Sequence, residues 1–241
     1  MTTKINQITV SEINVEVVRK KIKNLHIGVY PPDGRVRVAA PTKMGMEAIR
    51  VAVIGKLGWI KKHQLKFANQ ERQSPREYVT GETHYFQGRR YRLNLQPHDG
   101  RPRIMACHGT IELHVPTDSS IEYREALLYA WYRKQLKEQV PELLAKWEQI
   151  IGVQAAAWGV KRMKTRWGTC NPTARRVWLN LELIKKPIHC LEYIIVHELV
   201  HLLERLHNDR FTTLMDQYMP SWRQYREELN RQPLGHEGWG E

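Results

Sequence analysis

Residues 187–211 read PIHCLEYIIVHELVHLLERLHNDRF, and the rest of the chain is best understood from this stretch outward. At its centre His197, Glu198 and His201 form the pattern H-E-x-x-H. In one helix from Ile188 to Leu203, histidines four residues apart lie on the same face, so both imidazoles reach one ion. Glu198 points about 100° round the helix. It therefore lies beside the ion, where it can hold a water and act as general base.

The residues around this pattern predict an internal helix, because apolar side chains leave almost no polar face. They are Ile188, Leu191, Ile194, Ile195, Val196, Leu199, Val200, Leu202, Leu203 and Leu206. Buried histidine and glutamate side chains need polar partners, and a divalent cation supplies a partner for all of them. The alternative is a set of hydrogen-bonded core histidines, since a chain with eleven histidines also produces this pattern by chance.

A third histidine, His207, follows six residues after His201. In a continuous helix it would point away from the other two, so it becomes a ligand only if the helix ends near residues 204–206. Asn208 and Asp209 are good caps for a following helix at Arg210–Met219, which favours such a break. Three histidines with an open fourth position are typical of a catalytic zinc site.

The bulk composition indicates a soluble chain with anionic partners. Thirty-eight Lys and Arg against 25 Asp and Glu give a net charge of +13, which favours nucleotides, nucleic acid or acidic protein segments. The alternative is that the charge serves solubility alone. Three distant cysteines without a C-x-x-C pair indicate a reducing compartment. Without a signal-peptide core or a long apolar run, we expect a cytoplasmic protein with no membrane partner.

The hydrophobic pattern predicts an α+β fold that changes character near Pro116. Alternation over residues 5–37 indicates a β-meander, residues 44–69 have helical spacing, and short strands follow between residues 84 and 115. After Pro116 the pattern is helical, with Pro141 expected to break or kink the first helix. We therefore expect a strand-rich region with one long helix at 1–117 and a helical catalytic region at 118–241.

A basic stretch at residues 160–186 carries eight Lys and Arg against one acid, Glu182. Its candidate substrate-binding residues are Lys164, Arg166, Arg176 and Asn180. Arg166 or Asn180 near a metal would stabilise negative charge on the attacked group. The alternative is structural: Arg166 pairs with an acid such as Glu182, and Trp167 belongs to the core.

Several short motifs occur together in order between Thr165 and Phe211, and together they resemble the YgjP-like metal-dependent hydrolases, which are grouped with SprT-like and WLM proteases among the zincins. The motifs are R-W-G-T-C at 166–170, L-N at 179–180, a proline at 187, Y-I-I-V-H-E-L-V-H at 193–201 and H-N-D-R-F at 207–211. The resemblance implies that His197, His201 and His207 bind zinc and that Glu198 is the catalytic base. Thr165, Thr169 and Asn208 replace serines of the family pattern, and each keeps a polar side chain.

These observations favour a zinc-dependent hydrolase, first of all a metallopeptidase acting on an unfolded protein through a water activated by Glu198. An alternative is a metal-dependent nucleotide pyrophosphohydrolase, with a nucleoside triphosphate held by Lys and Arg. A third hypothesis is a non-catalytic nucleic-acid-binding protein with structural zinc, although such sites usually close all four positions with protein ligands. Imidazole ligands suit zinc, and also nickel, copper or iron.

Overall fold

The computed structural model describes residues 5–30, 33–68, 76–163 and 166–231. It has the mixed α+β fold that the sequence predicts, with a strand-rich first half followed by helices. The described residues form two compact units, one within residues 5–68 and one within residues 76–231. The expected division after residue 117 lies inside the second unit. The reason is that the strands of residues 83–115 share one core with the helices that follow them.

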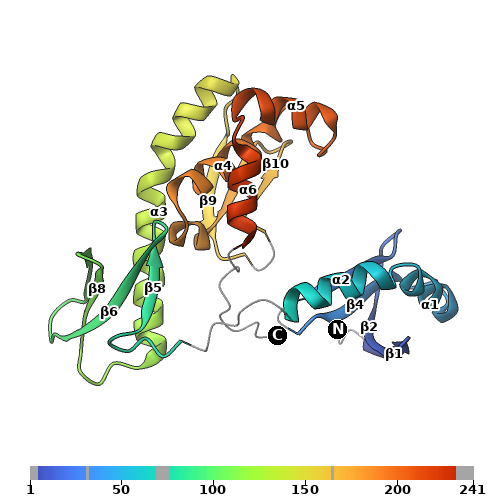
Figure 1. Ribbon diagram of the computed structural model, residues 1–241, viewed down its shortest axis with the longest axis horizontal. Helices are drawn as coiled ribbons and strands as arrows, with labels where there is room; N and C mark the ends of the chain where they lie inside the picture. The colour runs from blue at the N-terminus through green and yellow to red at the C-terminus, as the bar shows by residue number, and fades with distance from the viewer. Residues whose placement is uncertain (1–4, 31–32, 69–75, 164–165, 232–241) are drawn as a thin grey trace. The chain divides into compact units, whose positions relative to one another are not determined.

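The first unit is a four-stranded sheet covered by two helices (Figure 1). Its elements are β1 (Ile5–Val10), β2 (Ile13–Lys20), β3 (His26–Tyr30), β4 (Arg35–Pro41), α1 (Met46–Ile54) and α2 (Leu57–Ala68). The strand order is β1-β2-β4-β3, with β2 and β4 parallel, so the predicted meander is wrong. Alternating residues identify strands, but they do not say which strands pair.

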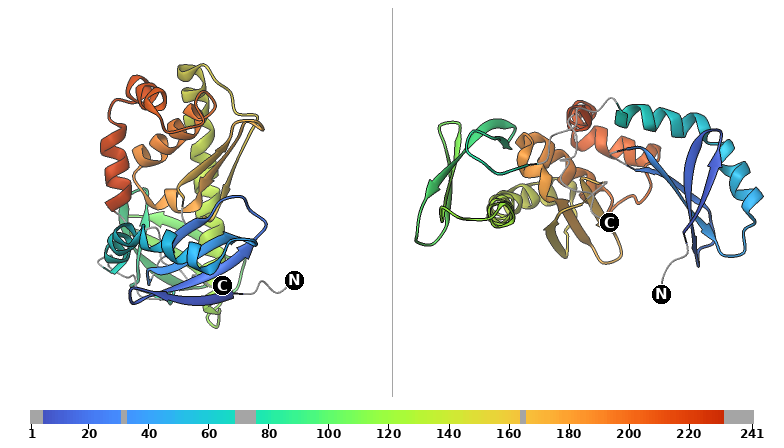
Figure 2. Two further views of the ribbon diagram at one scale, coloured as in Figure 1. Left: turned by 90° about the vertical axis from the view of Figure 1, so that its right-hand side faces the viewer. Right: turned by 90° about the horizontal axis from the view of Figure 1, so that it is seen from below.

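Helices α1 and α2 lie on one face of this sheet (Figure 2) and bury Ile49, Val53 and Ile60 against it. The sequence predicted one helix here, whereas the structure has two. The first ends at Gly55, whose backbone N–H donates to the Val51 carbonyl, while the Lys56 N–H donates to the Val53 carbonyl. Glycine is a poor helix residue, because its backbone loses the most conformational freedom on folding.

The second unit is built along one long helix, α3 (Ile121–Ile151), with a sheet beside each half (Figure 1). The first sheet has the order β5-β6-β8-β7 and consists of β5 (Thr83–Phe86), β6 (Arg89–Pro97), β7 (Arg103–Cys107) and β8 (Thr110–Val115). The second sheet has the order β10-β11-β9 and consists of β9 (Ala157–Lys161), β10 (Gly168–Asn171) and β11 (Arg176–Asn180). The short strands predicted between residues 84 and 115 are therefore confirmed.

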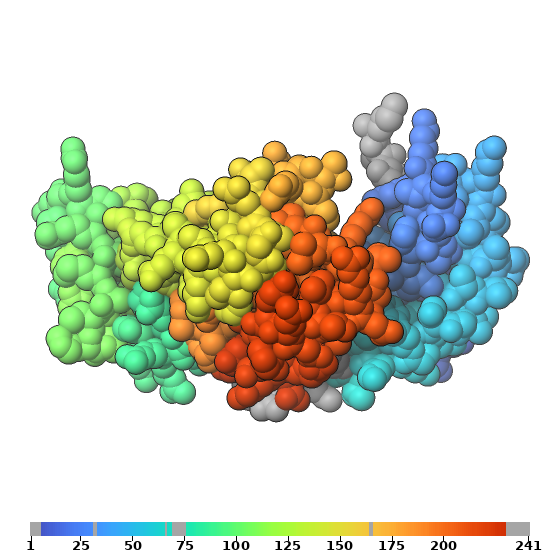
Figure 3. All heavy atoms as spheres, turned by 90° about the horizontal axis from the view of Figure 1, so that it is seen from above, coloured from blue at the N-terminus to red at the C-terminus, as the bar shows by residue number. Residues whose placement is uncertain are grey.

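The chain then continues through a 3-10 helix and three α-helices. These are η1 (Leu181–Lys185), α4 (Ile188–Val200), α5 (Asp209–Tyr218) and α6 (Trp222–Arg231). The Tyr218 hydroxyl donates to the Ile151 carbonyl at 3.5 Å, which joins α5 to the end of α3. In the space-filling view the yellow end of α3 and the orange and red helices form one continuous surface (Figure 3).

Pro141 lies inside α3, and the predicted break at this residue is wrong. Proline removes one backbone hydrogen bond from a helix, a cost that packing must offset. The neighbouring side chains Val140 and Leu144 are buried in the core of the second unit, while Pro141 itself faces solvent. Within the described residues, none of the helices has the length and apolar character needed to cross a membrane.

Candidate metal centre

Helix α4 passes through the core of the second unit, as its apolar sequence predicts. Its buried residues are Cys190, Leu191, Tyr193, Ile194, Ile195, Val196, Glu198, Leu199 and Val200. It ends at Val200, three residues earlier than expected, and the His201 N–H donates to the His197 carbonyl. The chain then turns through residues 201–207. The predicted break of the helix before His207 is therefore confirmed.

This turn brings three imidazole nitrogens together. Nε2 of His197 lies 3.2 Å from Nε2 of His201 and 3.1 Å from Nε2 of His207. In a tetrahedral site with zinc–nitrogen bonds of about 2.0–2.1 Å, the ligand nitrogens are about 3.3 Å apart. The three side chains thus form one potential metal site, and their spacing fits a bound ion.

Backbone and cap contacts hold His201 and His207 in this candidate site. The Nδ1–H of His201 donates to the Glu204 carbonyl at 3.0 Å, which leaves Nε2 with a free lone pair for a metal. The Asn208 side chain accepts from the Phe211 N–H at 3.0 Å and caps α5, as predicted. Both contacts stabilise the turn that carries His207.

Phe211 forms the apolar floor of the site. Its ring centroid lies 5.0 Å from that of His197 and 4.7 Å from those of His201 and His207, and only 3% of the residue is exposed. The sequence motif contains this phenylalanine, but its spacing alone does not predict a contact with all three imidazoles. Phe211 therefore restricts the rotation of the ligand side chains.

The surroundings of His197 and His201 favour the neutral imidazole, the form that binds a metal. Burial, together with smaller effects of the neighbouring His201, His207 and Arg226, lowers the pKa of His197 to about 3. Burial also lowers the pKa of His201, while its hydrogen bond to Glu204 acts in the opposite direction. A metal therefore does not have to compete with protons at His197 near neutral pH.

Glu198 lies beside this cluster, 4% exposed. Burial raises the pKa of its carboxyl to about 8, against an opposing effect of Arg166. Gly168 of β10 lies close to the Glu198 side chain: a Cβ added at Gly168 would be 2.5 Å from Glu198 Oε1. A strand glycine often marks such a close approach of another group. The sequence contains this signal, but only the structure shows which group approaches.

A cleft of about 900 Å³ opens in front of these residues. Residues 166–173, including strand β10, form one wall, and side chains of α4 and α6 line the other. Among the candidate substrate-binding residues, Arg166 lines this cleft. Arg176 is exposed at the start of β11 and is not among the lining residues. Lys164 falls outside the described residues.

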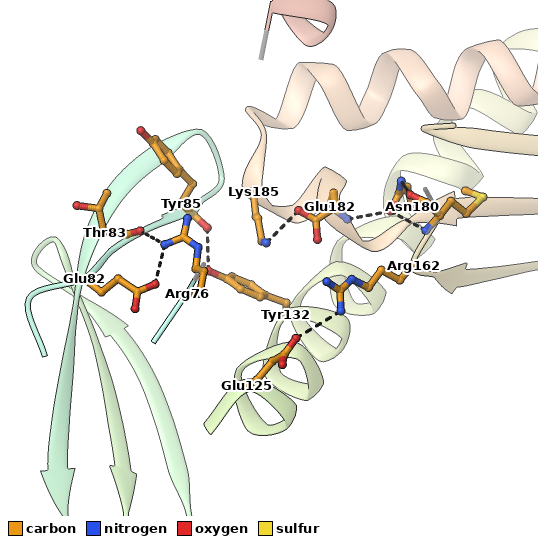
Figure 4. A network of polar contacts seen from close by, with 11 residues as sticks. Arg76, Glu82, Thr83, Tyr85, Glu125, Tyr132, Arg162, Asn180, Glu182 and Lys185 are labelled. Atoms are coloured by element: carbon orange, nitrogen blue, oxygen red, sulfur yellow. Dashed lines mark hydrogen bonds and ion pairs between the residues drawn. The ribbon is translucent and has the colours of Figure 1, made fainter. Parts of the chain in front are cut away.

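Asn180 has a different place from the one predicted: it is fully buried at the end of β11 and does not line the cleft. Its Nδ2 donates to the carbonyls of Met163 (2.8 Å) and Arg166 (2.7 Å). Its Oδ1 accepts from the N–H groups of Met163 (3.3 Å) and Glu182 (3.2 Å), the second being visible in Figure 4. These bonds use the whole amide, so Asn180 holds the segment that carries Arg166.

The alternative pairing of Arg166 with Glu182 is also wrong. Glu182 forms its ion pair with Lys185 at 2.9 Å (Figure 4). Trp167 is half-buried and packs against the core of the second unit, as that alternative expected, yet it also lines the cleft. Arg166 lines the cleft, where its charge acts on the Glu198 carboxyl.

A second group of metal-binding residue types lies at the other end of α4, where His189 and Cys190 meet Glu228 of α6. His189 Nε2 and Glu228 Oε2 are 2.7 Å apart. This is a hydrogen-bond distance, shorter than the separation of two ligands on one tetrahedral ion. The pair is therefore satisfied without a metal.

The sequence model of the YgjP-like metallopeptidase domain matches residues 23–232. The chain belongs to the YgjP-like metallopeptidase family. This confirms the resemblance of the motifs and supports a metal-dependent peptidase. A comparison with curated proteins finds no match.

Two solved structures, both metallopeptidase zymogens, are similar to part of the chain. Abylysin of Pyrococcus abyssi is 18% identical to this chain, with a TM-score of 0.37. The match covers 39% of this chain and 93% of the abylysin chain. Jannalysin of Methanocaldococcus jannaschii is 16% identical to this chain, with a TM-score of 0.35. The match covers 39% of this chain and 95% of the jannalysin chain.

Proposed function

We propose that this protein is a zinc-dependent metallopeptidase that cleaves unfolded protein segments, with Glu198 as the general base. The observation that carries the proposal is the convergence of three imidazole Nε2 atoms, 3.1–3.2 Å from His197 to its two neighbours, beside one buried carboxylate. The cluster opens on the cleft, which leaves room for a water and a substrate. A purely structural zinc site would close that position with a protein ligand.

His197, His201 and His207 are the residues that would hold the ion. When bound, zinc supplies a Lewis acid that lowers the pKa of a water and polarises a carbonyl. The His201–Glu204 hydrogen bond keeps one ligand in the required tautomer. Phe211 excludes water from beneath the rings, since it is buried against all three of them.

Glu198 would take the proton of the attacking water at a carboxylate oxygen and pass it to the leaving amine. A general base is most effective when its pKa lies near the working pH, and burial raises the pKa of Glu198 toward that range. Gly168 leaves space for the carboxylate, because any side chain there would occupy the position of Oε1. Arg166, which also lines the cleft, would stabilise negative charge that develops on the attacked carbonyl.

Strand β10 offers a surface for the substrate backbone. In the described sheet β10 pairs only with β11, so its other edge has free backbone groups. Residues 168–171 of this strand line the cleft. An extended peptide can add to such an edge through main-chain hydrogen bonds. This arrangement would place a peptide bond next to Glu198 and favours an unfolded protein as the substrate.

The nucleotide pyrophosphohydrolase remains a second candidate because of the charge of the cleft. Arg166, Arg205 and Arg226 all line it, and guanidinium groups bind phosphate well. In that case Glu198 would activate the water that attacks a phosphoryl group. The two candidates share their catalytic residues and differ only in the substrate.

A substrate panel with purified, zinc-loaded protein separates the two candidates. We expect cleavage of an unfolded protein such as reduced casein, and its loss in Glu198→Gln with the metal content unchanged. Hydrolysis of nucleoside triphosphates with the same dependence on Glu198, and no protein cleavage, would instead establish the pyrophosphohydrolase. Activity that Glu198→Gln leaves intact would contradict both.

A further inference from the structure

The charge of the cleft is unusually one-sided. Arg166 precedes β10, Arg205 lies in the turn between the second and third histidines, and Arg226 projects from α6. All three residues are exposed. Among the described residues that line the cleft, the only carboxylate is Glu198, which is buried. A substrate therefore meets three guanidinium groups on entering.

None of these three arginines forms an ion pair with a carboxylate within the described part of the chain. Other arginines do pair: Arg37 with Glu16 and Arg76 with Glu82, both at 2.9 Å. Arg226 lies over the Trp222 ring, 5.9 Å from its centroid, which is an aromatic and not an anionic partner. The cleft arginines are thus available for an external anion. A planar guanidinium binds a carboxylate through two parallel hydrogen bonds.

The placement of the arginines favours separate anionic groups over one compact anion. Arg166 belongs to the strand wall, Arg226 to the helical wall and Arg205 to the turn that carries the metal ligands. Such a distribution suits side chains that leave an extended backbone in different directions. In a peptide lying along β10, successive side chains point to opposite sides in this way.

We infer that the cleft selects peptide segments with Asp or Glu side chains on both sides of the scissile bond. This inference rests on the proposed peptidase function and names its substrate class. Arg205 and Arg226 are then specificity-determining residues: they bind substrate carboxylates and take no part in proton transfer. The excess positive charge also attracts acidic substrates before they bind, an effect that salt weakens.

The test uses zinc-loaded, full-length protein and three fluorogenic peptides of one sequence, whose flanking positions carry Glu, Gln or Lys. We expect kcat/KM for the Glu peptide to exceed that for the Gln peptide by roughly tenfold or more, as for a charge-assisted hydrogen bond in a partly shielded site. The Lys peptide should be the slowest of the three. Raising the salt concentration should reduce the advantage of the Glu peptide.

Arg205→Gln and Arg226→Gln should each reduce the Glu-to-Gln ratio of kcat/KM severalfold. Circular dichroism and zinc content, measured on each variant, show separately that it folds and keeps its metal. Arg103→Gln removes the same charge from an exposed position on strand β7, which does not line the cleft. It should leave the ratio unchanged.

Equal kcat/KM values for the Glu and Gln peptides would overturn this inference while leaving the peptidase function intact. An unchanged ratio in both cleft variants, or an equal fall in Arg103→Gln, would also overturn the assignment of Arg205 and Arg226. Failure to cleave any of the peptides or reduced casein, with nucleoside triphosphates hydrolysed, would contradict the proposed function itself.

Discussion

The two ends of helix α4 carry similar residue types in different arrangements. At the N-terminal end His189 and Cys190 meet Glu228, and at the C-terminal end His197 and His201 meet His207. In each group the ligand-type atoms all lie within 4.8 Å of one another. Proximity of metal-binding residue types therefore does not by itself distinguish a metal site.

The difference lies in the hydrogen bonds and the protonation of each group. At the N-terminal end the imidazole already has a carboxylate partner at 2.7 Å. Burial, with a further contribution from the Glu228 charge, raises the pKa of Cys190 to about 12, so its sulfur stays a thiol and not the thiolate that binds metals. At the C-terminal end three imidazole nitrogens face one another, and their separations of 3.1 and 3.2 Å fit the ligands of one tetrahedral ion.

The largest expected effect comes from removing one ligand at the C-terminal end. His201→Ala should lower zinc affinity by more than about 100-fold, beyond the range seen for residues outside the ligand shell, and abolish peptide cleavage. Metal content after gel filtration and a competition titration with a chelator measure this. His189→Ala is the matched control at the other end of α4. Loss of zinc in the control, or its retention in His201→Ala, would contradict the comparison.

A smaller loss of activity is expected when the Glu198 carboxylate is displaced. In Gly168→Ala the added Cβ would lie 2.5 Å from Glu198 Oε1, so the side chain of Glu198 must move. A displacement of about 1 Å in a catalytic group costs roughly 100-fold in rate, and kcat/KM for a peptide measures it. Zinc content should not change, because no ligand is touched.

Gly58→Ala serves as the control for this variant, since Gly58 is exposed on α2 and an added Cβ meets no atom within 4 Å. It should keep full activity and gain a few tenths to about 1 kcal/mol of stability, because alanine is the better helix former. Full activity of Gly168→Ala would show that Glu198 does not need its observed position.

Next to the N-terminal end of α4, Lys186 should affect stability alone. Burial lowers the pKa of Lys186 from 10.5 to about 8, with Glu182 opposing the shift. The protonated form is therefore disfavoured in the folded protein. This penalty is complete below pH 8 and disappears as the pH rises to about 10.5.

Lys186→Met should consequently stabilise the protein by about 2 kcal/mol at pH 7. Removing the buried charge gains about 3 kcal/mol, which is the free energy of the pKa shift. Losing the contact between the ammonium group and the Trp167 ring, 5.5 Å away, costs about 1 kcal/mol. Urea unfolding of both proteins between pH 7 and pH 10.5 measures the difference, which should shrink with rising pH. A difference that grows with pH would show that the lysine is stabilised in its charged form.

The sequence alone predicts the parts of the site that depend on local geometry. The spacing of His197 and His201 follows from the helical repeat, and the cap at Asn208 indicates the break that returns His207. The apolar residues of α4 predict a buried helix in the same way. A few consecutive residues are enough to specify each of these features.

The features that the sequence did not predict all depend on contacts between distant segments. Asn180 was expected near the substrate, whereas its amide binds backbone groups near residues 163–166. The approach of Gly168 to Glu198 requires β10 to lie along α4. Pro141 stays helical because Val140 and Leu144 are held in the core. The predicted strand pairing of the first unit was wrong for the same reason, because β4 lies between β2 and β3 in the sheet.

The most direct test of the central claim is zinc X-ray absorption spectroscopy on the loaded protein. The account predicts one zinc per chain with nitrogen or oxygen neighbours at about 2.0–2.1 Å, three of them imidazoles, and no sulfur. Glu198→Gln should give the same three-imidazole signature. A sulfur neighbour at about 2.3 Å would place the metal at a cysteine, such as Cys190, and contradict the account.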